Sequence, residues 1–321
     1  MLSNIIGLLI FPLTAIIAFA HKYQPGTFER EFFSKRQTTI LKGICICVVF
    51  LHHFSQICAD QEYIANAARV VKTAITLFFF LAGYTTALVH SRVNKLSLKK
   101  IWINRAWRLY LPIMIFSLPQ NNFLTPLLIF FIATDLAFIL FDDRRKRLAL
   151  ICFVNFIYVI IFAAVGVPEY WWNDVLTYFV GVAFAMYKEP VLAILQEKTR
   201  YCVTAIILFL VCIPSGYLAF NYRYYGIMSI IFSSFSCLVV VMLMMKLNLK
   251  SRLFYFLGKY SWEIYLSHQM FMILLNKYVD RNSIVLVLGV LLSVLFSIII
   301  QYLVKSLRAH TWLDLRKEVL Q

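Results

Sequence analysis

One apolar stretch carries the side chains best suited to chemistry. Residues 42–54 read KGICICVVFLHHF, with a lysine at the start and two adjacent histidines deep inside. An α-helix turns by about 100° per residue, so Lys42 and His53 share one face about 16 Å apart along the axis, whereas His52 points about 80° away from Lys42. An ionisable group inside a membrane helix is costly and indicates a functional site, and a neutral imidazole there is suited to general-base chemistry. The alternative is a histidine that only hydrogen-bonds a neighbouring helix.

Other polar side chains lie beside His53 or within further apolar runs. Gln56 falls near the same helix face as His53 and can orient one nitrogen of an imidazole. Asp135 lies in the middle of FFIATDLAFIL, and the sequence does not indicate a partner for its carboxyl group. Glu263 and His268 lie in one later run but are five residues apart, so they do not share a helix face.

A pair of arginines lies in the segment INRAWRLYLP. Arg105 and Arg108 are three residues apart and therefore share a helix face at the predicted cytoplasmic edge of the membrane. Two guanidinium groups at that spacing suit bidentate recognition of phosphate. The alternative is ordinary anchoring at the membrane surface, with Trp102 and Trp107 as interfacial residues.

Two further segments combine aromatic and polar residues. In FFFLAGYTTALVH, Gly83 suits close helix packing, Tyr84 adds a hydroxyl, and His90 at the end of the run is interpreted as an interfacial side chain. Residues 171–174 read WWND. The tryptophans are typical of an aromatic belt at the membrane surface, and the neighbouring polar groups leave contact with a sugar open as an alternative.

The composition indicates what must position these residues. The chain has 321 residues, of which 62% are hydrophobic and 14% charged, and its mean hydropathy is +0.79. Soluble domains are nearer 45–50% apolar, so this is an all-α polytopic membrane protein. The net charge of +16 fits cytoplasmic loops rich in Lys and Arg, and we expect no nucleic-acid partner. The seven cysteines show no metal-binding spacing, so we expect neither a disulfide framework nor a metal site.

The apolar runs predict about eleven transmembrane helices, at approximately 2–20, 40–59, 71–89, 102–118, 123–141, 148–166, 171–187, 202–220, 224–245, 261–278 and 284–304. Alternate loops, beginning with 21–39, carry most of the Lys and Arg. The positive-inside rule then predicts the N-terminus outside and the C-terminus in the cytoplasm. Residues 2–20 lack a basic n-region and are followed by basic residues, so we interpret them as a retained helix rather than a signal peptide.

Four stretches, in this order, resemble acyltransferase family 3, the bacterial integral-membrane O-acyltransferases. They are TILKGICICVVFLHHF, FFFLAGYTTAL, NRAWRLYLP and LGKYSWEIYLSHQ. The resemblance implies a ten-helix membrane domain over 40–304, preceded by an additional helix and loop in 1–39 and followed by a basic cytoplasmic tail in 305–321. It implies the bare membrane type, without a soluble esterase-like domain after the last helix.

The resemblance also implies roles for particular residues. The essential histidine of the family matches His53, although the adjacent His52 leaves that assignment open. The basic residue at the head of the same helix, often arginine in the family, is Lys42 here. Arg105 and Arg108 match the Arg-x-x-Arg pair implicated in acyl-CoA handling. Glu263 and His268 match the late segment in a supporting role, as Asp135, Gln56 and Tyr84 also could.

The implied activity is transfer of an acyl group, usually acetyl, from cytoplasmic acyl-CoA to a hydroxyl of a glycan or lipid-linked sugar. The enzyme would lie in the bacterial cytoplasmic membrane, with acyl-CoA as donor substrate and no bound cofactor. Its histidine would act as a general base or through a transient acyl-imidazole. A transporter or flippase is the alternative function, with His53, Asp135, Glu263 and His268 as a proton or substrate pathway. An inactive membrane scaffold is a third possibility, and the oligomeric state does not follow from the sequence.

Overall fold

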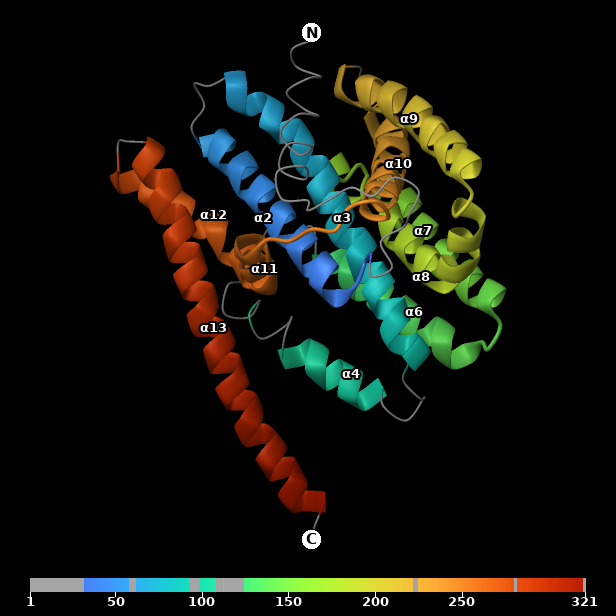
Figure 1. The fold of residues 1–321 in the computed structure, drawn as a ribbon. Helices are drawn as coiled ribbons and strands as arrows, with labels where there is room; N and C mark the ends of the chain where they lie inside the picture. The colour runs from blue at the N-terminus through green and yellow to red at the C-terminus, as the bar shows by residue number, and fades with distance from the viewer. Residues whose placement is uncertain are drawn as a thin grey trace. The chain divides into compact units, whose positions relative to one another are not determined.

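The computed structural model describes residues 32–57, 62–92, 98–107, 112, 124–221, 225–279 and 282–319. All regular elements in these ranges are helices (Figure 1). They are α2 (Lys35–Ile57), α3 (Glu62–Arg92), α4 (Leu98–Arg105), α6 (Leu124–Leu140), α7 (Arg144–Ala164), the 3₁₀ turn η3 (Glu169–Trp171), α8 (Leu176–Leu195), α9 (Lys198–Asn221), α10 (Tyr225–Met244), α11 (Arg252–Lys259), α12 (Ser261–Tyr278) and α13 (Asn282–Val319).

The predicted membrane-protein class is confirmed. Seven helical stretches within the described residues are long and apolar enough to cross a membrane, and they belong to α2, α3, α7, α8, α9, α10 and α13. Helices α6 and α12 lie where spans were predicted, although α6 has only 17 residues. The predicted span 2–20 and most of 102–118 lie outside the described residues. The total of eleven and the orientation of the termini therefore stay predictions.

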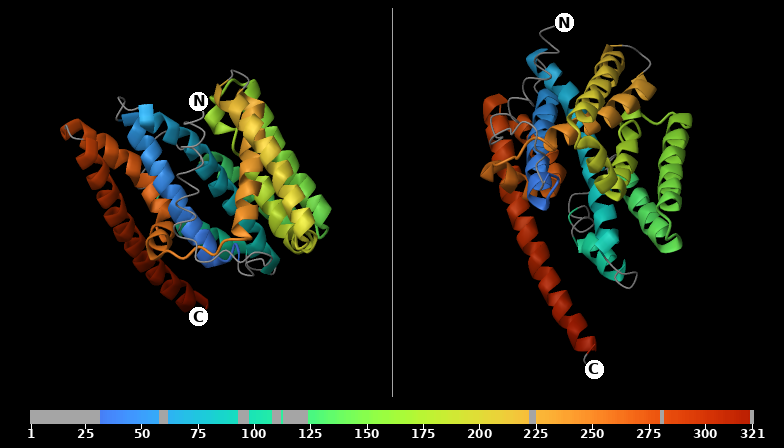
Figure 2. Two further views of the ribbon diagram at one scale, coloured as in Figure 1. Left: turned by 45° about the horizontal axis from the view of Figure 1, so that its top comes forward. Right: turned by 45° about the vertical axis from the view of Figure 1, so that its right-hand side comes forward.

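The chain forms two compact units. The first contains the described residues of Met1–Thr38, Arg69–Lys95 and Gln120–Lys250, and the second contains those of Thr39–Ala68, Leu96–Pro119 and Ser251–Gln321. In the first unit α9 lies along α10, and α8 contacts α7, α9 and α10 (Figure 2). In the second unit α12 lies along α13, and α11 leads into α12.

Glycines allow helices to approach closely in each unit. In the first unit a Cβ atom at Gly83 of α3 would overlap the carbonyl oxygen of Tyr178 in α8, so the packing role predicted for Gly83 is confirmed. In the second unit a Cβ atom at Gly43 would overlap the carbonyl of Phe254, and one at Gly258 would overlap the carbonyl of Thr39. Small residues at both contacts let α2 and α11 pack backbone against backbone.

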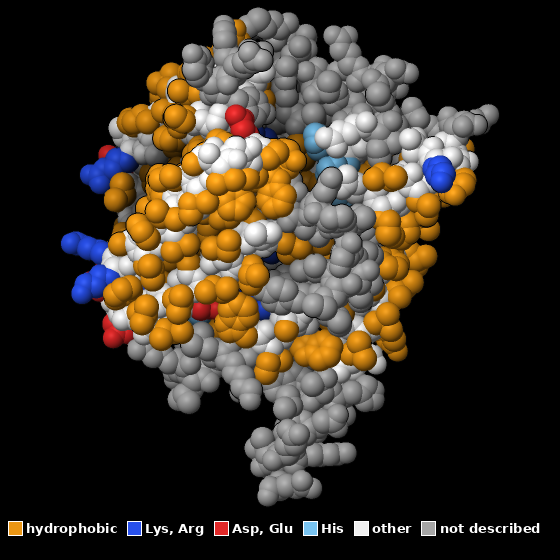
Figure 3. All heavy atoms as spheres, turned by 180° about the vertical axis from the view of Figure 1, so that it is seen from behind, with side chains coloured by type: hydrophobic (Ala, Val, Ile, Leu, Met, Phe, Trp, Pro, Cys, Tyr) orange, Lys and Arg blue, Asp and Glu red, His pale blue; other side chains and the backbone are white. Residues whose placement is uncertain are grey.

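The described surface is largely apolar, as expected where side chains face lipid. Figure 3 shows hydrophobic side chains over much of the visible face, with Lys and Arg gathered near its edges. Exposed examples come from α7, α9 and α13, namely Phe153, Ile160, Leu210, Leu291 and Tyr302.

The apolar helix α7 has a polar N-cap, Asp143. The Asp143 carboxylate accepts the backbone N–H groups of Lys146 and Arg145, and these hydrogen bonds lower its pKa below the usual range.

Candidate functional site

The candidate site is centred on His53, near the end of α2 in the second unit. Its Nδ1 lies 2.9 Å from the Oε1 of Gln56, one helical turn later. An amide oxygen can only accept a hydrogen bond, so Nδ1 of a neutral His53 carries the hydrogen and donates it. The lone pair is then on Nε2, which is the nitrogen able to take a proton. Gln56 thus lies in hydrogen-bond contact with the imidazole that it was predicted to orient, and the orienting role itself stays a prediction.

A second imidazole, from α12, lies beside His53. The ring centroids of His53 and His268 are 5.0 Å apart. Nδ1 of His268 lies 2.7 Å from the carbonyl oxygen of Tyr265 and 3.1 Å from that of Ile264. Both carbonyls accept, so Nδ1 of His268 is also the protonated nitrogen. Its Nε2 is therefore a hydrogen-bond acceptor, and it has no hydrogen-bond partner among the described residues.

The surroundings of this pair are mainly apolar. His268 is only 2% exposed, and the rings of Phe50 and Tyr265 each lie 5.8 Å from its ring. Phe50 and Met272 belong to one buried cluster between α2 and α12. A site walled in this way strengthens electrostatic interactions within it.

The adjacent His52 has a different environment from His53. Its ring centroid lies 5.1 Å from that of His53, on the same helix. The contact with His268 comes from His53, because successive residues on a helix point about 100° apart. This geometry favours His53 as the reactive histidine, and the choice between the two stays a prediction.

The other described residues predicted for the site in the second unit belong to α2, α4 and α12. Lys42 is partly exposed and precedes His53 by eleven residues on α2, which corresponds to about 16 Å. Arg105 ends α4, and its guanidinium lies 5.1 Å from the ring centre of Trp102. Glu263 is buried and accepts a hydrogen bond from Nε2 of Gln301, 3.2 Å away. Arg108 lies outside the described residues.

Asp135 and Tyr84 belong to the first unit. Asp135 is hydrogen-bonded through Oδ1 to Nε2 of His90, at 2.5 Å. The interpretation of His90 as an interfacial side chain is wrong, because its imidazole is buried against Asp135 and stacked on Phe138. Tyr84 is buried among the rings of an aromatic cluster formed by Phe33, Phe80 and Phe184.

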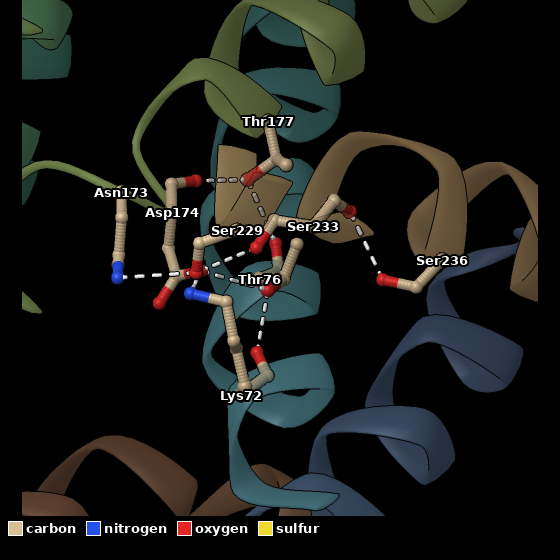
Figure 4. A network of polar contacts seen from close by, with 8 residues as sticks. All are labelled: Lys72, Thr76, Asn173, Asp174, Thr177, Ser229, Ser233 and Ser236. Carbon is tan, nitrogen blue, oxygen red and sulfur yellow. Dashed lines mark hydrogen bonds and ion pairs between the residues drawn. The ribbon is translucent and has the colours of Figure 1, made fainter. Parts of the chain in front are cut away.

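A polar network that was not predicted lies in the first unit (Figure 4). Nζ of Lys72 lies 2.8 Å from Oδ1 of Asp174, and the two residues are 7% and 6% exposed. The same oxygen accepts the hydroxyl of Ser233 at 2.6 Å, and Asn173 donates to Ser229 at 3.3 Å. Lys72 lies at the start of the predicted span 71–89, where a cation in an apolar run needs a partner, and this was the available signal.

Comparison with known proteins gives one match. A family model described as an acyltransferase domain matches residues 38–121 and 122–302. The two matched segments include α2, with His53, and α12, with His268. Neither the curated proteins nor the solved structures include a significant match.

Proposed function

The chain belongs to acyltransferase family 3, and from this premise we propose that it transfers an acyl group, normally acetyl, from cytoplasmic acyl-CoA to a hydroxyl of a glycan or lipid-linked sugar. The observation that carries the proposal is the hydrogen bond between Nδ1 of His53 and Oε1 of Gln56. Because Gln56 holds its Nδ1–H, the basic Nε2 is available for a proton at a site with apolar walls.

The reaction follows from that chemistry. Nε2 of His53 takes the proton of the acceptor hydroxyl as the oxygen attacks the thioester carbonyl. The new C–O bond forms, the C–S bond breaks, and the imidazolium returns the proton to the CoA thiolate. Attack by Nε2 itself, through an acyl-imidazole, is the second route open to the same nitrogen.

Cationic side chains of the second unit suit the donor. Arg105, with Arg108 three residues later, would bind the phosphates of CoA, and Lys42 would add a third positive charge. An extended pantetheine arm is on the order of 15–20 Å long, comparable to the rise of about 16 Å between Lys42 and His53. The thioester could then reach the imidazole while the nucleotide stays at the membrane surface.

The proposed topology supports a donor and an acceptor on opposite sides. We infer eleven transmembrane helices in the bacterial cytoplasmic membrane, with residues 2–20 added to a ten-helix core. The excess of Lys and Arg in alternate loops supports an outer N-terminus and a cytoplasmic C-terminus. Membership of an acyltransferase family favours this activity over a transporter or flippase.

The test uses membranes that contain the protein, labelled acetyl-CoA and a surface-glycan or lipid readout. We expect His53→Ala to lower label transfer about 100- to 10,000-fold, the usual contribution of a general base. We expect Arg105→Ala to raise the KM for acetyl-CoA about ten-fold, the loss of one charge-assisted contact. Arg200→Ala is the matched control, since Arg200 is exposed in a surface pair with Glu197. Full transfer by folded His53→Ala would overturn the proposal. Wild-type membranes that neither bind nor deacylate acetyl-CoA would favour the transporter.

A further inference from the structure

The imidazole rings of His53 and His268 are neighbours, with their centroids 5.0 Å apart. In their neutral forms, Nδ1–H of His53 is held by Gln56 and Nδ1–H of His268 by two backbone carbonyls. Both Nε2 atoms therefore carry lone pairs, and no hydrogen bond can form between them. We propose that the two imidazoles share the proton removed from the acceptor hydroxyl, with His268 accepting a hydrogen bond from the protonated His53.

The separation of the rings suits this role. A centroid separation of 5.0 Å is short enough for two imidazoles to be joined by an N–H···N hydrogen bond of about 3 Å once one of them is protonated. Nδ1–H of His268 is fixed by the carbonyls of Ile264 and Tyr265 on its own helix. Its Nε2 can therefore serve only as an acceptor, whether or not His53 is charged.

The unsatisfied Nε2 of His268 favours the protonated form of His53. Nε2 of His268 is buried and has no hydrogen-bond partner among the described residues, and such an atom destabilises the resting enzyme. Protonation of Nε2 in His53 supplies the missing donor. The interaction is then present when the hydroxyl has lost its proton and absent in the ground state, and only interactions of this kind accelerate a chemical step.

The proposal rests on the proposed acyl transfer and adds a defined task for His268. During transfer the O–H bond of the acceptor breaks and the proton binds Nε2 of His53. The N–H so formed donates to Nε2 of His268 while the C–O bond forms and the C–S bond breaks. The proton then leaves on the thiol of CoA, which restores two neutral imidazoles. The reaction therefore needs no reactant other than acyl-CoA and the acceptor hydroxyl.

The informative substitution is His268→Phe, which keeps a ring of similar size and removes the acceptor. We expect kcat for acetyl transfer to fall roughly 10- to 100-fold, the effect of losing a hydrogen bond to a charged group. The KM for acetyl-CoA is expected to change little. Thermal stability in detergent is expected to stay the same or rise, because an unsatisfied buried acceptor has been removed.

The matched control is His90→Phe, the same substitution at a histidine that is bonded to Asp135. We expect this variant to lose thermal stability, because a buried carboxyl loses a hydrogen bond. In a His53→Ala background, His268→Phe should change the residual transfer by less than about two-fold, because the two effects depend on one proton.

The outcomes separate this proposal from the proposed function. An active wild type with unchanged kcat in His268→Phe would overturn the proton-sharing pair and leave the acyltransferase assignment intact. A loss of thermal stability equal to that of His90→Phe would also overturn it, since His268 would then be structural. Absence of acetyl transfer in the wild type would instead count against the proposed function.

Discussion

One amide group contacts the imidazole of His53. Gln56 is exposed and accepts the Nδ1–H of His53 at 2.9 Å. It lies three residues after His53, so the sequence itself indicated that the two could interact. What the sequence lacked was the second imidazole, because His268 follows more than two hundred residues later.

Substitution of Gln56 tests the tautomer argument directly. In Gln56→Leu the Nδ1–H loses its acceptor, so both tautomers become populated and the ring is free to turn. We expect kcat to fall about ten-fold, which corresponds to about 1.4 kcal/mol in the barrier. Gln56→Glu keeps an acceptor at the same place and should retain more activity than Gln56→Leu. Steady-state kinetics at saturating acetyl-CoA measures kcat for both variants. Equal kcat values would contradict the role of Gln56 as the acceptor for the Nδ1–H of His53.

Pairs such as His90 with Asp135 illustrate why side-chain partners escaped prediction. The sequence marked Asp135 as an acid that needs a partner, because a carboxyl in an apolar span is costly. It could not say which helix faces α6, since hydropathy fixes the position of a span and not its neighbours. For the same reason the sequence did not identify Asp174 as the partner of Lys72.

The helices themselves were predicted better than their contacts. Helix α12 occupies the residues predicted for its span, and α2, α3 and α6–α10 overlap theirs. Long apolar runs identify such helices because an unpaired backbone is costly in lipid. Helix α11 lies between the predicted spans 224–245 and 261–278, and its eight residues are too few for a span. Its Ser251 cap, which accepts the N–H of Phe254, was the available signal.

The ion pair between Lys72 and Asp174 connects three elements of the first unit. It links α3 to the residues that precede α8, and Ser233 of α10 joins through the same oxygen. Removing one partner of a buried pair leaves an uncompensated charge, so we expect Asp174→Ala to destabilise the protein by about 3–5 kcal/mol. The double variant Lys72→Met/Asp174→Leu should be far less affected, because no charge is left behind.

Thermal unfolding of purified protein in detergent compares these variants. Ser236→Ala is a suitable control, since the Ser236 hydroxyl donates to the backbone carbonyl of Ser233 at the edge of the network and bonds no charged group among the described residues (Figure 4). A double variant as unstable as Asp174→Ala would show that the network contributes more than charge compensation.

The whole molecule must have a defined orientation for transfer across a membrane. Helix α8 offers a direct measurement, because Tyr170 precedes it, Gln196 follows it, and both side chains are exposed. The pattern of basic loops predicts that residue 170 is outside and residue 196 is cytoplasmic. A cysteine in place of Tyr170 should therefore react with a membrane-impermeant thiol reagent on intact cells. A cysteine in place of Gln196 should react only after permeabilisation, with wild type as the background for the native cysteines.

The result also constrains the chemistry. If the labelling is reversed, the inferred orientation is wrong and the basic segment that carries Arg105 would face away from cytoplasmic acyl-CoA. If both positions react on intact cells, α8 does not cross the membrane and the predicted alternation of loops fails at this helix. If the labelling follows the prediction, the basic residues 91–105 face the cytoplasm, which supplies acyl-CoA. His53 would then be reached from that side by a thioester arm about as long as half a bilayer.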